Sequence, residues 1–361
     1  MPAGPDPGAC KQEVRHATSY AQPSSRPDEH RHGRSDAAAN VAATGAPLRA
    51  LPPGYRLRHP TVDDLPAIQR LVDECEAATC GEPRESDWDT VAMFGIPDAH
   101  PARNWWVLEH ASGGLAGFAT VYWPPTGEAR GMVEVPPDHS GRGLSAYLFR
   151  TVAARARELA ADSPEGPTPA LYLECEDARS ERQAWLLAHG YRRVREVFIM
   201  RADLKQGSAA PVWPPGMDVR DMRPHVDDEA LCAADNEAFA EHFLNIPAPL
   251  DAWRAHVYGH ADLDPGLWVV AWDGAEVAGQ AGARPCGNAA SIDDVMVRKP
   301  WRGRGLGLAL LLEVFARLHE RGRDDVSLWV DAENATGAVR LYEAAGMRVW
   351  RHIGMFKLEL A

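Results

Sequence analysis

The sequence predicts an α/β protein (α+β, with a mixed sheet) built from two copies of one folding unit. Short apolar runs of strand length alternate along the chain with longer segments whose apolar residues recur at helical spacing. A glycine-rich helix start in the first half, Gly141-Arg-Gly-Leu144, recurs in the second half as Gly303-Arg-Gly-Leu306. Gly54 and Gly216, which begin the first predicted strand of each half, are separated by the same offset. Self-similarity at one offset is typical of an internal duplication.

The chain has 361 residues, enough for two domains of ordinary size. We predict an N-terminal domain at residues 51–204, a C-terminal domain at 216–361, and a linker at 205–215 that is rich in proline, glycine and serine. Residues 1–50 lack hydrophobic periodicity, so we expect a disordered N-terminal extension there. Because we find neither a secretory signal nor an apolar run of about 18 residues, we expect a cytoplasmic protein without a membrane partner.

The composition narrows the classes of partner. Lys and Arg number 38 against 51 Asp and Glu, and the resulting charge of −13 argues against nucleic acid or an anionic membrane as partner. The 6 cysteines show neither a CxxC pair nor the Cys/His spacing of a zinc site, so we predict reduced thiols and no metal. Hydrophobic residues make up 45%, enough for a sizeable core, and we expect a monomer whose two domains pack together.

One stretch of the second half carries the predicted chemistry. An apolar run at Ile292–Val297 predicts a strand, a basic glycine-rich turn follows at 298–307, and residues 308–321 have the spacing of an amphipathic helix. A second strand at 326–330 and a helix at 335–345 complete the stretch. A helix that begins after a glycine turn points unpaired backbone N–H groups and its positive dipole end at one place. The turn therefore predicts an anion site suited to a pyrophosphate group.

Two common nucleotide motifs do not fit this turn. A Walker loop needs Gly-Lys-Ser/Thr at the helix start, and the chain has Gly307-Leu308-Ala309 instead. A dinucleotide-binding fingerprint needs a third glycine, where the chain again has Leu308. It also needs a strand-end acid about 20 residues further on, and no clear one follows. The turn therefore predicts neither ATP nor a nicotinamide dinucleotide as ligand.

The motif Arg302-Gly-Arg-Gly305-Leu-Gly307 resembles the Arg/Gln-x-x-Gly-x-Gly/Ala pyrophosphate loop of the GNAT superfamily of N-acetyltransferases. The resemblance extends to Asp331-Ala-Glu-Asn334 and to Leu341-Tyr342, which follow in the order and spacing typical of that family. It implies two tandem GNAT-like domains, each with a central, mostly antiparallel sheet flanked by helices. It also implies acetyl-CoA as co-substrate and a primary amine of a small molecule or peptide as acceptor.

The resemblance further implies a set of cofactor contacts on the strand, the turn and the helix start. These are Val295, Met296, Val297, Arg302, Gly303, Arg304, Gly305, Leu306, Gly307, Leu308 and Asn334. Val295 and Val297 would pair with pantetheine as an added strand, and the N–H of Val297 would face the developing oxyanion. Two alternatives stay open: Arg302 and Arg304 either hold phosphate or are solvated, and Asn334 either contacts pantetheine or caps the following helix.

The candidate catalytic residues are Asp293, Asp294 and Tyr342. The amine must lose a proton before it attacks the thioester, and one of the two acids would take that proton. Neighbouring strand residues face opposite sides, so we expect only one acid to reach the pocket; the alternative is that both are exposed strand acids. Tyr342 would give a proton to the leaving thiolate, or would be only a core aromatic of the last helix. The family builds its acceptor pocket near the residues that follow the first helix of this half, here Phe239, His242 and Phe243.

The two halves are not equivalent at the positions that carry the motif. Aligned on the glycines, the first half has Ser140 for Arg302, Ser145 for Gly307, Ala178 for Asn334 and Leu186 for Tyr342. We therefore place catalysis in the C-terminal half. The first half is expected either to bind no cofactor or to hold one without using it.

The tandem layout resembles the mycothiol synthases, a two-domain group of GNAT enzymes that acetylate a cysteinyl amine. The acid that this group places early in the strand before the loop falls at Ser291 here, so a cysteinyl amine is an alternative acceptor rather than the first one. Asp293 and Asp294 favour a cationic amine. A non-catalytic coenzyme A-binding sensor or scaffold is a further alternative, and the presence of Tyr342 and Asn334 argues against it.

Overall fold

A computed structural model describes most of the chain beyond the predicted N-terminal extension. The described residues are 50–81, 90–94, 99–123, 128–162, 169–240, 242–243, 247–259, 263–286, 289–334 and 337–360. The extension predicted at 1–50 therefore lies outside them except for Ala50. The predicted mixed α/β class is confirmed. In this part of the chain, no helix combines the length and the apolar character needed to cross a bilayer.

The first half contains six strands and the helices that connect them, as far as the structure describes it. In chain order the elements are β1 (Tyr55–Arg58), η1 (Val62–Asp64), α1 (Leu65–Cys80), α2 (Thr90–Phe94), α3 (Pro101–Asn104), β2 (Trp105–His110), β3 (Leu115–Tyr122), β4 (Glu128–Glu134), η2 (Pro137–His139), α4 (Leu144–Asp162), β5 (Ala170–Glu176), α5 (Ser180–Ala188) and β6 (Arg192–Asp203).

The second half repeats this order of strands. Its elements are β7 (Asp218–Asp221), α6 (Asp228–Ala238), α7 (Leu250–Tyr258), η3 (Pro265–Leu267), β8 (Trp268–Asp273), β9 (Glu276–Cys286), β10 (Ala289–Val297), η4 (Lys299–Trp301), α8 (Leu306–Glu320), β11 (Asp325–Asp331), α9 (Ala338–Ala344) and β12 (Arg348–Glu359). The strand, glycine turn, helix, strand and helix of the predicted stretch are all present. The sequence did not predict α7.

The strands of both halves join in one sheet. Within the described residues it has 12 strands in the order β1-β2-β3-β4-β5-β12-β6-β11-β10-β9-β8-β7. Two neighbouring pairs, β4–β5 and β10–β11, are parallel, and the other pairs are antiparallel. The expected mostly antiparallel sheet is therefore confirmed, with one parallel pair at the equivalent place in each half.

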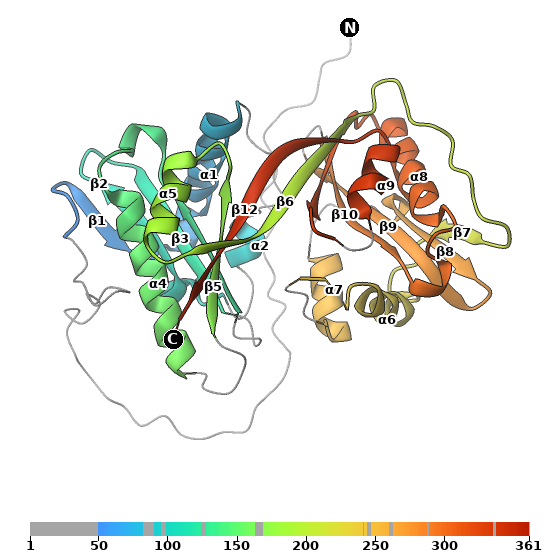
Figure 1. Cartoon of the computed structure of the whole chain (residues 1–361), viewed down its shortest axis with the longest axis horizontal. Coiled ribbons are helices and arrows are strands. Elements are labelled where there is room, and N and C mark those ends of the chain that lie inside the picture. Colours follow the sequence, from blue (N-terminus) through green and yellow to red (C-terminus); the bar gives the residue numbers. More distant parts are fainter. Residues whose placement is uncertain are drawn as a thin grey trace, which may run out of the picture. The chain divides into compact units, whose positions relative to one another are not determined.

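The two halves exchange their last strands. β12 pairs with β5 of the first half and with β6, and β6 pairs with β11 of the second half (Figure 1). β12 is therefore an inner strand of the sheet, with a partner on each side. Its side chains explain the position: Phe356 and Leu358 are buried in the core of the first half, against residues such as Leu148 and Leu171.

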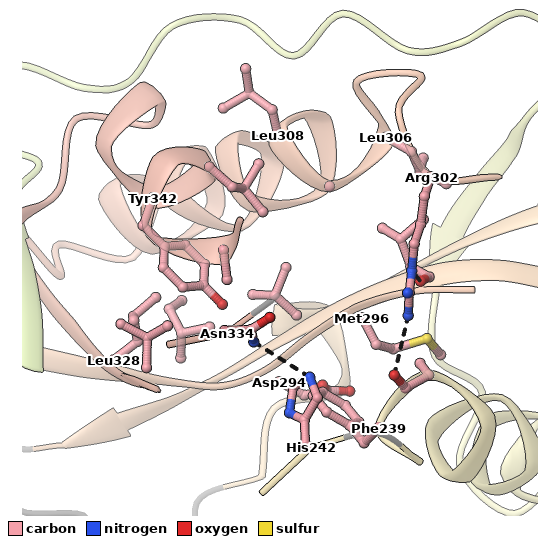
Figure 2. A pocket seen from close by; sticks show the side chains of 18 of the residues that line it. Phe239, His242, Asp294, Met296, Arg302, Leu306, Leu308, Leu328, Asn334 and Tyr342 are labelled. Atoms are coloured by element: carbon pink, nitrogen blue, oxygen red, sulfur yellow. Dashed lines mark hydrogen bonds between the residues drawn. The ribbon is translucent and has the colours of Figure 1, made fainter. Parts of the chain in front are cut away.

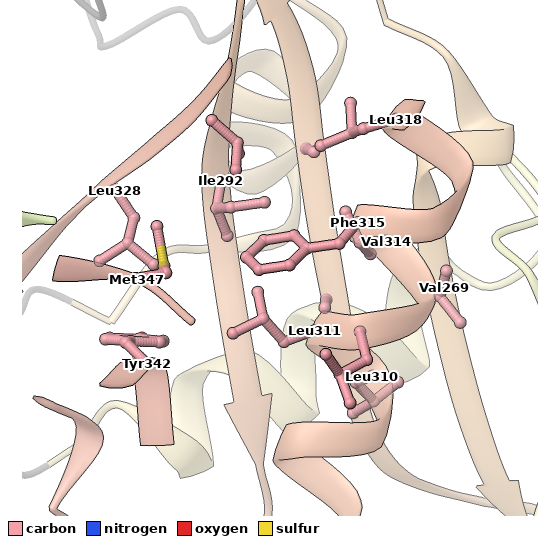
Figure 3. Packing of buried hydrophobic residues seen from close by; sticks show 14 of the residues in the cluster. Val269, Ile292, Leu310, Leu311, Val314, Phe315, Leu318, Leu328, Tyr342 and Met347 are labelled. Atoms are coloured by element: carbon pink, nitrogen blue, oxygen red, sulfur yellow. The ribbon is translucent and has the colours of Figure 1, made fainter. Parts of the chain in front are cut away.

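Helices cover the second-half sheet on both faces. On one face, α8 buries Leu310, Leu311, Val314, Phe315 and Leu318 against strand residues that include Val269, Ile292 and Leu328 (Figure 3). On the other face, α6 and α7 pack their apolar residues against Trp268, Val270 and Met296. Strand β10 thus sends Ile292 toward the α8 side and Met296 toward the α6 side.

The strand exchange predicts that the second half does not fold alone. We expect residues 216–361, produced separately, to show no cooperative thermal transition by circular dichroism, because β11 loses β6 and β12 loses both neighbours. A longer fragment that begins at Gly190 restores β6 and serves as the control, since β6 then pairs with both strands again. A transition of the shorter fragment as sharp as that of the full chain would contradict this prediction.

Candidate active site

A cavity lies where the parallel strands β10 and β11 separate. Among the described residues these strands pair at Ala290 with Val326 and at Ser291 with Ser327, and not beyond. The cavity in the gap has a volume of about 420 Å³. Its wall includes residues 292–297 of β10 and 328–331 of β11, together with the glycine turn and parts of α6, α8 and α9.

The structure brings nearly all predicted site residues to this wall. The lining includes Asp293, Asp294, Val295, Met296, Val297, Arg302, Gly303, Gly305, Leu306, Gly307, Leu308, Asn334 and Tyr342 (Figure 2). Arg304 is exposed and is not part of the wall. Sequence reasoning missed a second group of wall residues on the turn, β11 and α9: Trp301, Leu328, Trp329, Val330 and Ala338. Asp331 and Leu341, which also line the wall, entered the sequence analysis only as parts of the motifs, without a role in the site.

The glycine turn leaves an open space in front of α8. Gly303 and Gly305 have φ of +74° and +83°, and a Cβ atom added at either would meet nothing within 4 Å. Gly305 is the N-cap of α8, whose first hydrogen bond runs from Ala309 N to Gly305 O at 3.1 Å. The N–H groups of Leu306 and Gly307 precede that bond and form the positive end of the helix dipole. This geometry suits an anion.

Arg302 has a structural role that the sequence did not suggest. Its Nε donates to the carbonyl of Val297 at 2.9 Å, and its Nη2 donates to the carbonyl of Ala238 at 3.2 Å. The side chain therefore ties the turn to the end of β10 and to the end of α6 (Figure 2). A phosphate contact of this guanidinium stays a prediction.

The two neighbouring acids have different surroundings. Asp293 accepts two hydrogen bonds from Arg284, from Nε and Nη2 at 2.8 Å each, in a mostly buried ion pair. Asp294 accepts a short hydrogen bond from Gln280, and its Oδ1 is buried without a partner among the described residues. The strand register shifts between Ile292 and Asp294, so the simple alternation of faces fails here and both acids reach the wall.

The surroundings of Asp294 favour its neutral form. Burial, followed by the nearby carboxyl of Asp235, raises the pKa of Asp294 well above its usual value, and Asp293 adds to this. The hydrogen bond from Gln280 acts in the opposite direction. Asp294 is thus the acid of the pair whose proton affinity is raised, as a general base requires.

Tyr342 is both a core residue and a wall residue. It is 8% exposed and packs in the cluster that contains Leu328 and Met347, yet its ring reaches from α9 toward the cavity (Figure 2). Burial, with a smaller effect of Asp294, raises the pKa of Tyr342 above its usual value. The phenol is therefore protonated at neutral pH and can donate a hydrogen bond or a proton.

Asn334 and His242 meet across the cavity. Asn334 Nδ2 lies 3.5 Å from His242 Nε2 (Figure 2), and burial lowers the pKa of His242, which makes the imidazole neutral at pH 7. The interpretation of Asn334 as a helix cap is wrong: α9 begins at Ala338, and Gly337 is its N-cap. The asparagine lies instead at the end of β11, in the cavity wall.

The equivalent gap in the first half is filled by side chains. Glu134 of β4 accepts hydrogen bonds from Arg179 at 2.6 Å and from Arg182 at 3.2 Å. Burial by itself would raise the pKa of Glu134, but the two guanidinium groups outweigh it and lower this pKa to about 2. Only about 80 Å³ stays empty there, and Arg182 occupies the position that is Ala338 in the second half. A cavity of about 630 Å³ does remain beside the first-half glycine turn.

Comparison with known proteins agrees with this geometry. Residues 229–347, which include most of the cavity wall, match the Acetyltransferase (GNAT) family. A mycothiol acetyltransferase of Thermobispora bispora is 31% identical over 303 residues, which cover 80% of this chain and 94% of that protein. The chain belongs to the GNAT family of acetyltransferases, and it is an enzyme that transfers an acetyl group to an amine.

Further relatives match most of the length of the chain. The mycothiol acetyltransferase of Salinispora tropica is 28% identical, over 82% of this chain and 92% of that protein. A GCN5-related N-acetyltransferase of Sphaerobacter thermophilus is 29% identical, with a TM-score of 0.74 over 86% of this chain and 97% of that chain. A tandem GNAT protein from the clavulanic acid biosynthesis pathway is 19% identical, with a TM-score of 0.62 over 85% of this chain and 99% of that chain, and shares the fold.

Proposed function

We propose that the cavity between β10 and β11 binds acetyl-CoA and that the C-terminal half catalyses direct attack of a primary amine on its acetyl group. One observation carries the proposal. A single wall combines the open glycine turn at the start of α8 with the phenol of Tyr342 and a carboxyl oxygen of Asp294 that has no partner in the described part of the chain. An anion site, a base and an acid therefore face one space.

The residues present fit acetyl-CoA. A diphosphate in front of Gly303 and Gly305 would meet backbone N–H donors and the positive end of α8. Beyond Ser291 the backbone of β10 has no partner on the β11 side among the described residues. The amide chain of pantetheine can pair with Val295 and Val297 there, as an added strand. Asn334, at the end of β11, is the proposed side-chain contact to that chain.

Three groups of the chain carry the proposed chemistry. Asp294 takes a proton from the attacking amine, the N–H of Val297 stabilises the oxyanion that forms, and Tyr342 gives a proton to the thiolate that leaves. Asp293 is not assigned a chemical step, because the guanidinium of Arg284 already neutralises it.

The proposed acceptor is a primary amine of a small molecule or a peptide. A cysteinyl amine is the specific candidate, because the curated relatives are mycothiol acetyltransferases. Since the chain belongs to a family of enzymes, the sensor or scaffold alternative is not retained.

Calorimetric titration tests the proposed function first. We expect the purified chain to bind acetyl-CoA, and neither ATP nor NADH, and to release coenzyme A thiol when amines from a panel that includes a cysteinyl amide are added. A folded sample that binds no acetyl-CoA would overturn the assignment of this cavity. Binding without acceptor-dependent thiol release from any amine would overturn the proposed chemistry.

Tyr342→Phe provides a separate test of the proposed acid. We expect turnover to fall about 100-fold while the affinity for acetyl-CoA stays within a factor of about two, because the ring is kept and only the proton donor is lost. Steady-state kinetics and calorimetry measure the two quantities. The thermal midpoint serves as control, since Phe fills nearly the same buried space. An unchanged rate would make Tyr342 a core residue alone.

A further inference from the structure

The part of the cavity wall around Asp294 lies near more carboxyl groups than the proposed function uses. Two buried acceptor atoms, Asp294 Oδ1 and Gln280 Oε1, have no hydrogen-bond partner among the described residues. Buried acceptors without donors are costly, and Asp294 is the one of these two residues that lines the cavity, where a ligand can bring a donor. The ring of Trp268 closes this region on one side, since it packs over Gly282, the residue that Asp294 faces in the sheet.

A second carboxyl lies beside this region, on α6. Asp235 is three and four residues before Ala238 and Phe239, which line the cavity, so helical spacing places all three on one face of α6. The side chain of Asp235 forms no hydrogen bond or ion pair with the described residues, and burial raises its pKa to about 6. Asp235 also acts on the carboxyl of Asp294 and helps to raise its pKa.

Among the described residues, no positively charged side chain forms an ion pair with Asp235 or Asp294. The groups that face them are Gln280 of β9, Asp293 of β10, Tyr342 of α9 and Cys232 of α6. Asp293 is occupied by Arg284, and His256 of α7 lies beside that ion pair. Arg302 donates to two backbone carbonyls instead. Two neighbouring carboxyls without a counter-ion among the described residues resist ionising together, so the protonation of one depends on that of the other.

We propose that Asp235 and Asp294 together form the subsite for the acceptor's primary ammonium group, with Asp235 as a positioning residue behind the base. The proposal deepens the function proposed above and rests on it. An ammonium group brings three N–H donors and one positive charge, which match the carboxyl of Asp294 in the cavity wall and the charge of the pair.

The proton balance follows from this arrangement. The ionised carboxyl of the pair takes one proton from R–NH₃⁺: an N–H bond breaks, an O–H bond forms, and the neutral amine keeps the lone pair that attacks the thioester. A net negative subsite also repels an acceptor with a carboxylate next to its amine. We therefore expect amino acid amides to be acetylated in preference to the free amino acids.

Asp235→Asn, compared with Glu229→Gln on the exposed side of the same helix, tests the pair. With alaninamide, cysteinamide and their free acids as acceptors, we expect the acid limb of kcat/KM in the Asn variant to move about one unit to lower pH. This shift follows because the neighbouring charge that raises the pKa of Asp294 is gone. We also expect KM for the amide to rise several-fold with KM for acetyl-CoA unchanged. Asp235→Glu should restore the limb, and Glu229→Gln should match the unmodified chain.

A second readout does not depend on acetyl-CoA. The raised pKa of Asp235 means that the folded chain keeps a proton which the unfolded chain loses, so its stabilising effect is present below about pH 4 and is lost as pH rises through about 6. The thermal midpoint of the unmodified chain should therefore fall more between pH 5 and 8 than that of Asp235→Asn. If the thermal midpoints of the unmodified chain and of Asp235→Asn fell equally with pH, and their pH–rate profiles coincided, the proposed pairing of Asp235 with Asp294 would be wrong. A chain that binds no acetyl-CoA would overturn the proposed function, and the acceptor role with it, even where the slopes differ.

Discussion

Asp294→Asn is expected to lower kcat about 100-fold or more while acetyl-CoA binds with unchanged affinity. The amide has nearly the shape of the carboxyl and can still contact Gln280, but it cannot take a proton from the amine. Initial rates of thiol release, measured from pH 6 to 9 with saturating acetyl-CoA, check the prediction. In the unmodified chain the rate should rise with pH as the base loses its proton, at a higher pH than an ordinary carboxyl would, because burial, followed by Asp235, raises the pKa of Asp294. The residual rate of Asp294→Asn should not show this rise with pH.

The neighbouring acid supplies the matched control. Asp293→Asn should keep most of the rate, since this carboxyl is already paired with Arg284, but it should lower the free energy of unfolding by about 1–3 kcal/mol because a mostly buried guanidinium loses its partner. Denaturant melts of both variants measure this difference. A large loss of rate in Asp293→Asn with an unchanged rate in Asp294→Asn would reverse the assignment of the base.

The sequence predicted the parts of the candidate site that are local in the chain. The strand and the glycine turn follow from periodicity and from the turn residues, Tyr342 was singled out by the family resemblance, and the structure places all three around one cavity. The exchange of β6 and β12 was missed because alternation of apolar residues reports that a strand has two faces, and not which strands lie beside it.

The electrostatic properties of the site could not be predicted from spacing. Asp293 and Asp294 are adjacent and equivalent in the sequence, and they differ in the fold because Arg284 pairs with one, while the other is buried beside Gln280 and Asp235. Asp235 gave no signal at all, since an acid on a surface helix is ordinarily solvated. Arg179 and Arg182 are likewise unremarkable in the chain until folding brings both to Glu134.

Gly305→Glu is expected to abolish acetyl-CoA binding and turnover. Gly305 has a φ of +83°, its Cβ would face open space, and it caps the helix whose N–H groups form the anion site. A Glu side chain would place a negative charge where the diphosphate is expected, and a non-glycine residue in this conformation costs about 1–2 kcal/mol of stability. Calorimetry with acetyl-CoA and the thiol-release assay measure the two losses.

Gly143→Glu is the control that separates charge at the site from strain in the backbone. Gly143 has a φ of +78° in the first-half turn, also with open space around its Cβ, so the substitution carries the same conformational cost. The second-half site is untouched, and since Arg179 and Arg182 close the first-half gap, we expect turnover to be unchanged. Equal loss of turnover in both variants would mean that the first half takes part in catalysis. Normal binding by Gly305→Glu would remove the glycine turn from the acetyl-CoA site.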